Sequence, residues 1–311
     1  MHGTSRSSAF TGTRTFAFLL LALSNLFWGS NWVIGRALRD AFGPVSINFW
    51  RWTVAALILA PFALHSVIAN RDAIRRHWGL LLLLSIAGVV LFQSMVYLGL
   101  RTTTAVNAVL LNSSAPLFML LCSFAIERER ATPRQIAGML ISLAGILVIL
   151  SRGDAASLLR LELHSGDAWI LAAMPIWGVY SVLLKRSPAE LGGVAFVFLM
   201  AIVGVALLAP MYALETLSIP ARWPNAQEAA ALLYIGAAAS AAGLLFWNRG
   251  VAIVGANAAG FTLHLLPAFG TVLAMLFLGE SFHAFHAAGV ATIIAGVVVA
   301  TRDRGPARGA R

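Results

Sequence analysis

The sequence predicts an all-α integral membrane protein whose ten transmembrane helices form two inverted five-helix repeats. Three observations predict this fold: the composition is strongly apolar, apolar runs of about twenty residues recur along the chain, and the second half resembles the first. Hydrophobic residues make up 59% of the 311 residues and charged residues only 11%, whereas soluble proteins carry roughly 25% charged residues. Most of the surface is therefore expected to face lipid.

Ten apolar windows follow one another along the chain. The first comes after Arg14, is longer than a signal-peptide core and lacks a clear cleavage site, so we interpret it as a retained helix. The connections are short, apart from those near 152–166 and 215–229, and leave no room for a soluble domain. The predicted spans are 15–35, 45–66, 78–98, 103–126, 134–151, 167–185, 192–214, 230–249, 256–279 and 283–301.

The distribution of Lys and Arg predicts the orientation of the chain. The segments on the side of both tails carry 15 of these residues and the opposite side carries 6. Because positive residues favour the cytoplasmic face, both termini are predicted to be cytoplasmic, in the inner membrane. The excess of arginine is thus explained without a nucleic-acid partner. The predicted segments are a cytoplasmic tail 1–14, a first repeat 15–151, a periplasmic connector 152–166, a second repeat 167–301 and a cytoplasmic tail 302–311.

The repeat is visible at an offset of 151 residues without a gap. Matched pairs include Pro116 with Pro267, Glu129 with Glu280, Gly138 with Gly289 and Gly145 with Gly296. Each copy contains five predicted spans, an odd number, so the second copy must enter the membrane upside down. Such inverted repeats form a binding site near the bilayer midplane, between the two halves, and permit alternating access.

Two prolines are candidates for kinks that line this site. Pro116 and Pro267 lie near the middle of the fourth and ninth spans, where each removes a backbone donor and frees a carbonyl four residues earlier. In lipid, a freed carbonyl must find a partner or line a cavity. The prolines are therefore either a symmetric pair bordering a central cavity or bends that serve packing.

Polar and aromatic residues deep in the spans are the candidate substrate-binding residues. In the first span, Ser24, Trp28 and Asn31 share one helical face, and the sixth span carries a second Trp-Gly pair. Ionisable residues at membrane depth are functional candidates. The predicted substrate-binding residues are Trp28, Asn31, Asn112, Trp177, Tyr180 and His264. The alternatives are aromatic packing between helices, interhelical hydrogen bonds and a neutral core histidine.

Arg51 is a cation within the second span, where burial costs roughly 2.5–3.5 kcal/mol on insertion scales. Two interpretations remain open: the side chain extends outward or contacts a carbonyl, or it binds an anion in the cavity. Gln93, in the third span, is a weaker polar candidate. All 12 Asp and Glu residues fall in loops, tails or span ends, so no embedded carboxylate is available for proton coupling.

Two further expectations concern helix ends. Thr132 and Pro133 are predicted as the N-cap and first residue of the fifth span. Amphipathic indole rings prefer the membrane interface. The tryptophans near span ends, predicted as interfacial anchors, are Trp50, Trp52, Trp78, Trp169 and Trp223.

Several stretches carry a resemblance to a known family. They are LFWGSNWVIGR, INFWRWTVAALIL, TTTAVNAVLLNSSAPLF, GDAWILAAMPIWGVYSVLLKR and GANAAGFTLHLLPAFG. In this order, over nearly the whole chain, they resemble the EamA-type members of the drug/metabolite transporter superfamily. The resemblance implies a ten-helix carrier that moves a small-molecule substrate, an amino acid or related metabolite, out of the cell.

Two other classes remain as alternatives: an intramembrane enzyme and a non-transporting membrane scaffold. An enzyme requires a nucleophile with a base, a metal set or paired carboxylates near one depth. The sequence contains no HExxH motif, no GxSxG motif and no buried acid pair. We therefore predict no catalytic residues, no metal and no cofactor.

Overall fold

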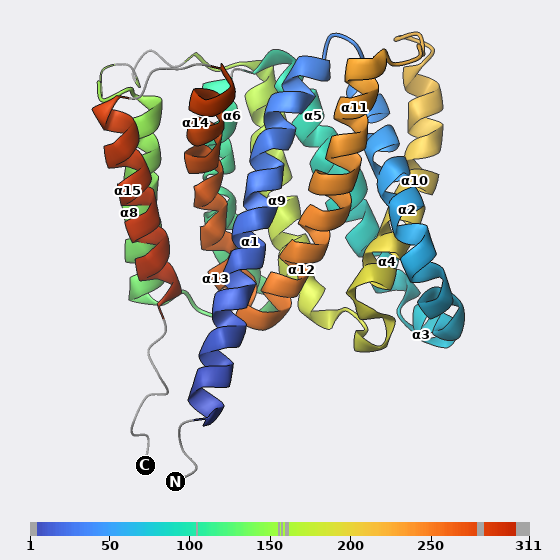
Figure 1. Ribbon diagram of the computed structural model, residues 1–311, viewed down its shortest axis with the longest axis horizontal. Helices are drawn as coiled ribbons and strands as arrows, with labels where there is room; N and C mark the ends of the chain where they lie inside the picture. The colour runs from blue at the N-terminus through green and yellow to red at the C-terminus, as the bar shows by residue number, and fades with distance from the viewer. Residues whose placement is uncertain are drawn as a thin grey trace.

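The computed structural model describes residues 5–103, 105–154, 156, 158, 162–278 and 283–302, which form helices and no strand. The long helices stand side by side in one bundle (Figure 1). Among the described residues, nine segments are long and apolar enough to cross a membrane. The predicted all-α, multi-pass membrane protein is therefore confirmed.

The first half contains α1 (Ser5–Leu38), α2 (Pro44–Ala69) and the short α3 (Arg71–Arg76). The third span is interrupted by a π-helix, and the fourth by a turn. Their parts are α4 (Trp78–Ser85), η1 (Ile86–Leu91), α5 (Phe92–Thr102), α6 (Ala105–Asn112) and α7 (Ala115–Glu127), followed by α8 (Pro133–Leu150).

The second half begins with α9 (Ser165–Leu183), continues through the 3₁₀ turns η3 (Leu184–Arg186) and η4 (Ala189–Leu191), and reaches α10 (Gly192–Glu215). The eighth span again contains a π-helix. The remaining elements are α11 (Ala226–Tyr234), η5 (Ile235–Ala242), α12 (Gly243–Val254), α13 (Ala256–Phe261), η6 (Thr262–His264), α14 (Leu265–Leu278) and α15 (Ala284–Thr301). Most bounds agree with the predicted spans to within five residues, but α1 begins ten residues earlier than expected.

The fourth and ninth spans, which carry the two prolines predicted as kinks, are each interrupted near that proline. Pro116 is the second residue of α7, which begins after a turn at Ser113 and Ser114. Pro267 is the third residue of α14, which follows the 3₁₀ turn η6. Proline in a helix interior removes a hydrogen bond and clashes with the preceding turn, which explains why the α-helical pattern breaks here. Glu280 lies outside the described residues.

Two helix pairs hold the edges of the bundle. Helices α8 and α15 pack closely, as Figure 1 also shows. Helices α2 and α10 are joined where the Glu215 carboxylate accepts hydrogen bonds from the backbone N–H groups of Val45 and Ser46, at 3.0 and 2.7 Å. A carboxylate satisfies the free N–H groups of a helix N-terminus and the positive end of its dipole. The start of α1 and the end of α15 lie at the same end of the bundle (Figure 1).

The structure confirms the predicted helix cap and corrects one predicted anchor. The Thr132 hydroxyl caps α8 and forms a capping box with Gln135. Trp52 is only 1% exposed, so its assignment as an interfacial anchor is wrong. Residues two apart on a helix point to different faces, and in α2 the neighbouring Trp50 is the one that faces outward. Trp78, Trp169 and Trp223 are exposed.

Candidate functional site

A cluster of aromatic side chains lies at the centre of the bundle. The ring centroids of Trp28 in α1 and Trp177 in α9 are 5.1 Å apart, edge to face. Trp247 of α12 lies 5.2 Å from Trp28 and 5.4 Å from Trp177, and Phe92 of α5 lies 4.7 Å from Trp177. Edge-to-face and offset contacts of this kind are the favoured geometries for aromatic rings. The cluster therefore joins α1, α5, α9 and α12 through ring contacts.

A small cavity lies against this cluster. It is lined by Trp28, Asn31, Trp32, Phe92, Gln93, Asn112, Trp177, Leu263 and Leu266. These residues come from α1, α5, α6, α9, η6 and α14. The accessible space is about 20 Å³, which is room for one or two water molecules. In this conformation the cavity is too small for a metabolite, so a metabolite could enter only if the helices moved apart.

Two indole N–H groups of the aromatic cluster have no partner among the described residues, and one of them belongs to the cavity wall. The indole Nε1 of Trp177 is buried and makes no hydrogen bond within the described part of the chain. Trp247 has a second such indole N–H, whereas Trp28 donates to the carbonyl of Ala239 at 2.9 Å. Buried donors in proteins normally have a partner. The N–H of Trp177 is thus an unsatisfied donor on a residue that lines the cavity.

The structure brings four of the six predicted substrate-binding residues together at this cavity: Trp28, Asn31, Asn112 and Trp177. Tyr180 and His264 do not line it. The Tyr180 ring stacks on Trp177 with centroids 5.1 Å apart, and its hydroxyl donates to Asn248 Oδ1 at 2.7 Å. Tyr180 therefore supports the wall from behind.

His264 is fully buried and holds three segments together. Its Nε2 lies 3.0 Å from the carbonyl oxygen of Ser113, and its Nδ1 contacts the Ser142 hydroxyl of α8. Ser113 is in the turn before Pro116, so one carbonyl exposed by that interruption has found a side-chain partner, as a lipid environment requires. The sequence suggested that the carbonyl of Asn112 is freed; the carbonyl that meets His264 is the next one.

Arg51 is also fully buried, so the expectation that its side chain extends outward is wrong. Its Nε donates to Ser240 Oγ at 2.6 Å, and its Nη1 donates to Gln93 Oε1 at 2.9 Å and to the Tyr97 hydroxyl at 2.8 Å. Tyr97 in turn donates to Asn31 Oδ1 at 2.8 Å. Arg51 is thereby connected to two residues of the cavity wall, Gln93 and Asn31.

Three residues of this region were not predicted from the sequence. Trp247 lies close to the predicted end of its span at 249, but the helix continues to Val254, so the ring is inside the bundle. Tyr97 and Ser240 are single polar residues in apolar spans, and the face they occupy is set by their neighbours. The only feature of the sequence that could have indicated Tyr97 and Ser240 is that each is a polar residue deep in an apolar span.

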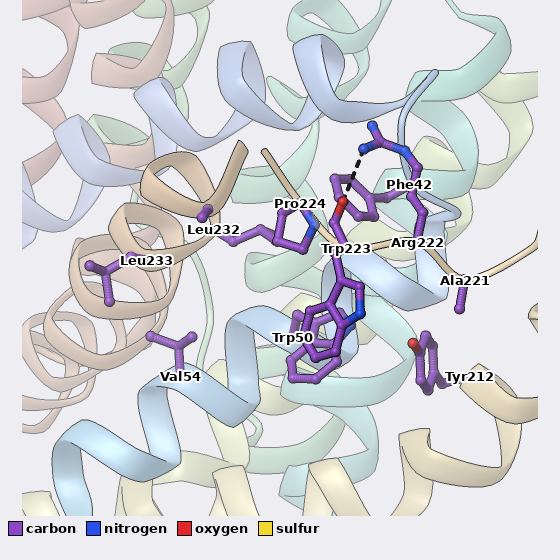
Figure 2. Close-up of a pocket in the computed structure, with 11 residues that line it drawn as sticks. Phe42, Trp50, Val54, Tyr212, Ala221, Arg222, Trp223, Pro224, Leu232 and Leu233 are labelled. Atoms are coloured by element: carbon purple, nitrogen blue, oxygen red, sulfur yellow. Dashed lines mark hydrogen bonds between the residues drawn. The ribbon is translucent and has the colours of Figure 1, made fainter. Parts of the chain in front are cut away.

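A larger hollow of about 480 Å³ lies elsewhere, between α2, α10 and α11 (Figure 2). Its lining includes Phe42, Trp50, Tyr212 and Trp223, and it shares no residue with the central cavity. Arg222 at its edge pairs with Glu228 at 2.6 and 2.9 Å, and this hydrogen bonding raises the pKa of the Arg222 guanidinium. The hollow is therefore mainly aromatic and apolar, and its cation is already paired.

Comparison with known proteins places this arrangement in a family. The sequence profile of the EamA-like transporter family matches residues 15–151 and again residues 164–302. The chain belongs to the EamA-like transporter family. By this membership it is a multi-pass membrane transporter.

Relatives with assigned names are also transporters. An uncharacterized transporter of Archaeoglobus fulgidus is 28% identical, over 91% of this chain and 96% of the relative. A probable terminal-alkyne amino-acid exporter of Streptantibioticus cattleyicolor is 28% identical over 91% and 92%. An S-adenosylmethionine/S-adenosylhomocysteine transporter of Chlamydia muridarum is 23% identical over 86% and 85%. A crystal structure with 22% identity and a TM-score of 0.70 covers 94% of this chain and 96% of its own, which shows a shared fold.

Proposed function

We propose that this EamA-like protein is a secondary transporter that exports an amino acid or related small metabolite across the inner membrane by alternating access. The substrate site is the central cavity. Trp28, Asn31, Asn112 and Trp177 contact the substrate, while Tyr180 and His264 hold the wall in place.

The observation that carries the proposal is the composition of the cavity wall. Aromatic faces from α1, α5 and α9 surround a space that is also lined by three amides and by a tryptophan with an unpaired indole N–H. Small-molecule sites are mostly apolar with a few convergent polar groups. Asn112 makes no hydrogen bond through its side chain to any described residue, and lines this space. Its amide is therefore free to orient a substrate.

The small size of the cavity supports alternating access. A transporter must alternate between states in which the site opens to one face or the other, and a substrate shifts the populations of those states. A cavity with room for only one or two waters cannot hold a metabolite, so the bound state requires a second arrangement of the helices. Separation of the halves would enlarge the cavity without unfolding any helix.

Ten spans in two inverted repeats account for several paired features. His264 Nε2 contacts the carbonyl of Ser113, and these positions are 151 residues apart, the offset of the sequence repeat. The third and eighth spans each contain a π-helix, and the fourth and ninth are each interrupted near a proline. Equivalent positions that meet in space are expected where two repeats face each other across a pseudo-twofold axis.

The direction and cargo follow from the relatives and are part of the proposal. One relative is named an amino-acid exporter and another an S-adenosylmethionine/S-adenosylhomocysteine transporter. Amino acids and S-adenosylmethionine all contain an α-amino acid group. A cargo with this group is the one that we propose for the present chain.

The proposal is tested by cysteine substitution in a Cys122→Ala background. Cysteines at positions 28, 31, 112 and 177 should react with a water-soluble thiol reagent in proteoliposomes and be protected by a transported amino acid. Cysteines at Leu57 and Phe62, which are exposed on α2, should stay unreactive because hydrocarbon suppresses thiolate formation. Labelling confined to one half, or no flux of any of the twenty L-amino acids, would contradict the proposal.

Orientation has a separate test. Reporter fusions after Arg311 and near Gly153 should report cytoplasm and periplasm respectively, because the excess of positive residues lies on the side of both tails. A periplasmic signal from the C-terminal fusion would exclude the proposed orientation, and the same signal from both fusions would exclude five spans in the second repeat.

A further inference from the structure

Arg51 carries a charge that no carboxylate of the described residues balances, although its guanidinium lies 5.8 Å from the ring centroids of Trp52 and Tyr97. A guanidinium stays protonated in proteins, and a charge in the membrane interior is costly unless it is paired. Its three hydrogen-bond partners, Ser240, Gln93 and Tyr97, are all neutral. None of the carboxylates in the described ranges forms an ion pair with it.

The hydrogen-bond capacity of Arg51 is also incomplete. Its Nη2 is buried and has no partner among the described residues. Arginine binds carboxylates through two parallel N–H···O bonds, most often along one edge of the guanidinium. The Nη1–Nη2 edge of Arg51 now holds only neutral oxygens, on Nη1. One bidentate site for an oxyanion is therefore incompletely filled.

This site adjoins the central cavity. Gln93, whose amide oxygen accepts from Nη1, is a lining residue of the cavity, and Asn31, which accepts from Tyr97, is another. The aromatic cluster lies on the same cavity, where Trp28, Phe92 and Trp177 contribute to the lining. Arg51 itself does not line the cavity and lies behind Gln93, so an amphipathic molecule there would meet apolar faces and would reach the cation once the Gln93 amide moves aside.

We propose that Arg51 binds the carboxylate of the transported molecule, which is an α-amino acid or a compound that carries the same group. The inference rests on the proposed function and specifies how its site recognises cargo. The carboxylate displaces the Gln93 amide oxygen from Nη1 and bonds to Nη1 and Nη2, while the apolar part of the molecule lies against the aromatic rings. No covalent step is involved.

Alternatively, Arg51 has a purely structural role and joins α2, α5 and η5 through its three neutral partners. Replacement of Arg51 would lower the stability of the protein in either case, but a structural role predicts no preference for a carboxylate ligand. The test must therefore compare ligands that differ only in the carboxylate.

The experiment uses the purified full chain and two probes: a mixture of the twenty L-amino acids and a mixture of their α-carboxamides. The acids should raise the melting temperature of the wild type and the amides should not. In Arg51→Met the apparent affinity for the acids, taken from the concentration dependence of the melting temperature, should fall by about tenfold or more, because a charge-assisted bidentate contact is lost. Ser240→Ala removes a structural partner but should keep the preference for acids.

Gln93→Glu keeps the test informative if Arg51→Met does not fold. This variant places a carboxylate where the proposed ligand would bind, so it should stabilise the ligand-free protein and abolish the response to acids. Asn248→Asp is the matched control, since it adds the same charge in the second half where no cation is bonded to it. It should lower the melting temperature.

Three results would overturn the proposal: equal stabilisation of the wild type by acids and amides, an unchanged acid response in Gln93→Glu, or no response of the wild type to either mixture. If chloride raises the melting temperature of the wild type relative to methanesulfonate, and does not do so in Arg51→Met, the site binds an inorganic anion instead. Flux in proteoliposomes separates the hypothesis that Arg51 recognises a carboxylate from the hypothesis that the protein is a transporter. Acid-specific, Arg51-dependent binding without flux would contradict the transport proposal and leave the recognition site intact.

Discussion

Two helix pairs bring corresponding segments of the two halves together and pack in opposite ways. In the pair α8–α15, the backbones touch: a Cβ added at Gly145 would stand 2.7 Å from the carbonyl oxygen of Gly289. In α1 and α9, contact is made by the rings of Trp28 and Trp177, whose centroids are 5.1 Å apart. The first pair has no space between its backbones, whereas the second borders a cavity.

The difference shows how a duplicated sequence can build both a closely packed helix pair and a pair that borders a cavity. Small residues let helices approach in a membrane, where close packing replaces the hydrophobic effect as the source of association. Large rings keep backbones apart and leave irregular space between them. We therefore expect larger side chains between α8 and α15 to lower the stability of the protein. Substitutions between α1 and α9 should mainly change the rate of transport.

The two halves also differ in charge. Asn31 accepts from Tyr97 in the first half, and Tyr180 donates to Asn248 in the second, so both halves contain an Asn–Tyr pair. The Trp-Gly pairs at positions 28 and 177 are 149 residues apart, two fewer than the matched residues of the later spans, and at this spacing the residue that corresponds to Arg51 in the second half is Met200. Met200 Sδ lies 4.0 Å from the Tyr180 hydroxyl. The polar framework is thus duplicated, but the cation is not.

The largest effect is expected from Gly145→Leu, which should lower the free energy of unfolding by about 3 kcal/mol or more because a backbone contact must open. Gly79→Leu is the matched control, since Gly79 is exposed in α4 and a Cβ there would meet nothing within 4 Å. Thermal unfolding in detergent measures both. Equal stability of the two variants would refute the rigid-pair interpretation of α8–α15.

Trp177→Ala should reduce the kcat/KM for transport by about 10- to 100-fold, because it removes an aromatic wall and its indole N–H from the cavity. Trp223→Ala removes an indole that is 90% exposed and should change flux less than about twofold. Flux in proteoliposomes, corrected for the amount of folded protein, compares them. If both variants transport normally, the cavity is not the site.

Tyr97→Phe and Tyr180→Phe sharpen the comparison of the halves. Tyr97 accepts from a charged group, so its loss should cost about 1.5–3 kcal/mol of stability, whereas the neutral bond of Tyr180 is worth about 1 kcal/mol. Both variants keep the ring and its packing. Denaturation of both variants under one condition gives the difference between their free energies of unfolding. A larger loss of stability in Tyr180→Phe would show that the charge of Arg51 does not strengthen the hydrogen bonds of Tyr97.

The smallest effect is expected from His264→Gln. Glutamine can replace one of the two contacts that His264 makes, so the loss should be near the average of about 0.6 kcal/mol for a hydrogen bond inside a membrane protein. Because His264 does not line the cavity, competition between substrates should be unchanged. A changed order of substrate preference would place His264 in the recognition site.

The sequence by itself determined the class of protein, the helical spans and the points where helices break. Hydropathy located the spans because a helix needs about twenty apolar residues to cross the bilayer, and Pro116, Pro267 and Thr132 mark breaks and a cap through local backbone chemistry.

Only the tertiary structure decided which side of each helix faces the cavity. Arg51 and Trp52 are turned inward and Trp50 outward, although all three lie in one apolar run. Lipid and protein interior are equally apolar, so composition does not distinguish the two faces of such a helix; the neighbouring helices do, by supplying Gln93, Tyr97 and Ser240 as partners for a charge that lipid would exclude.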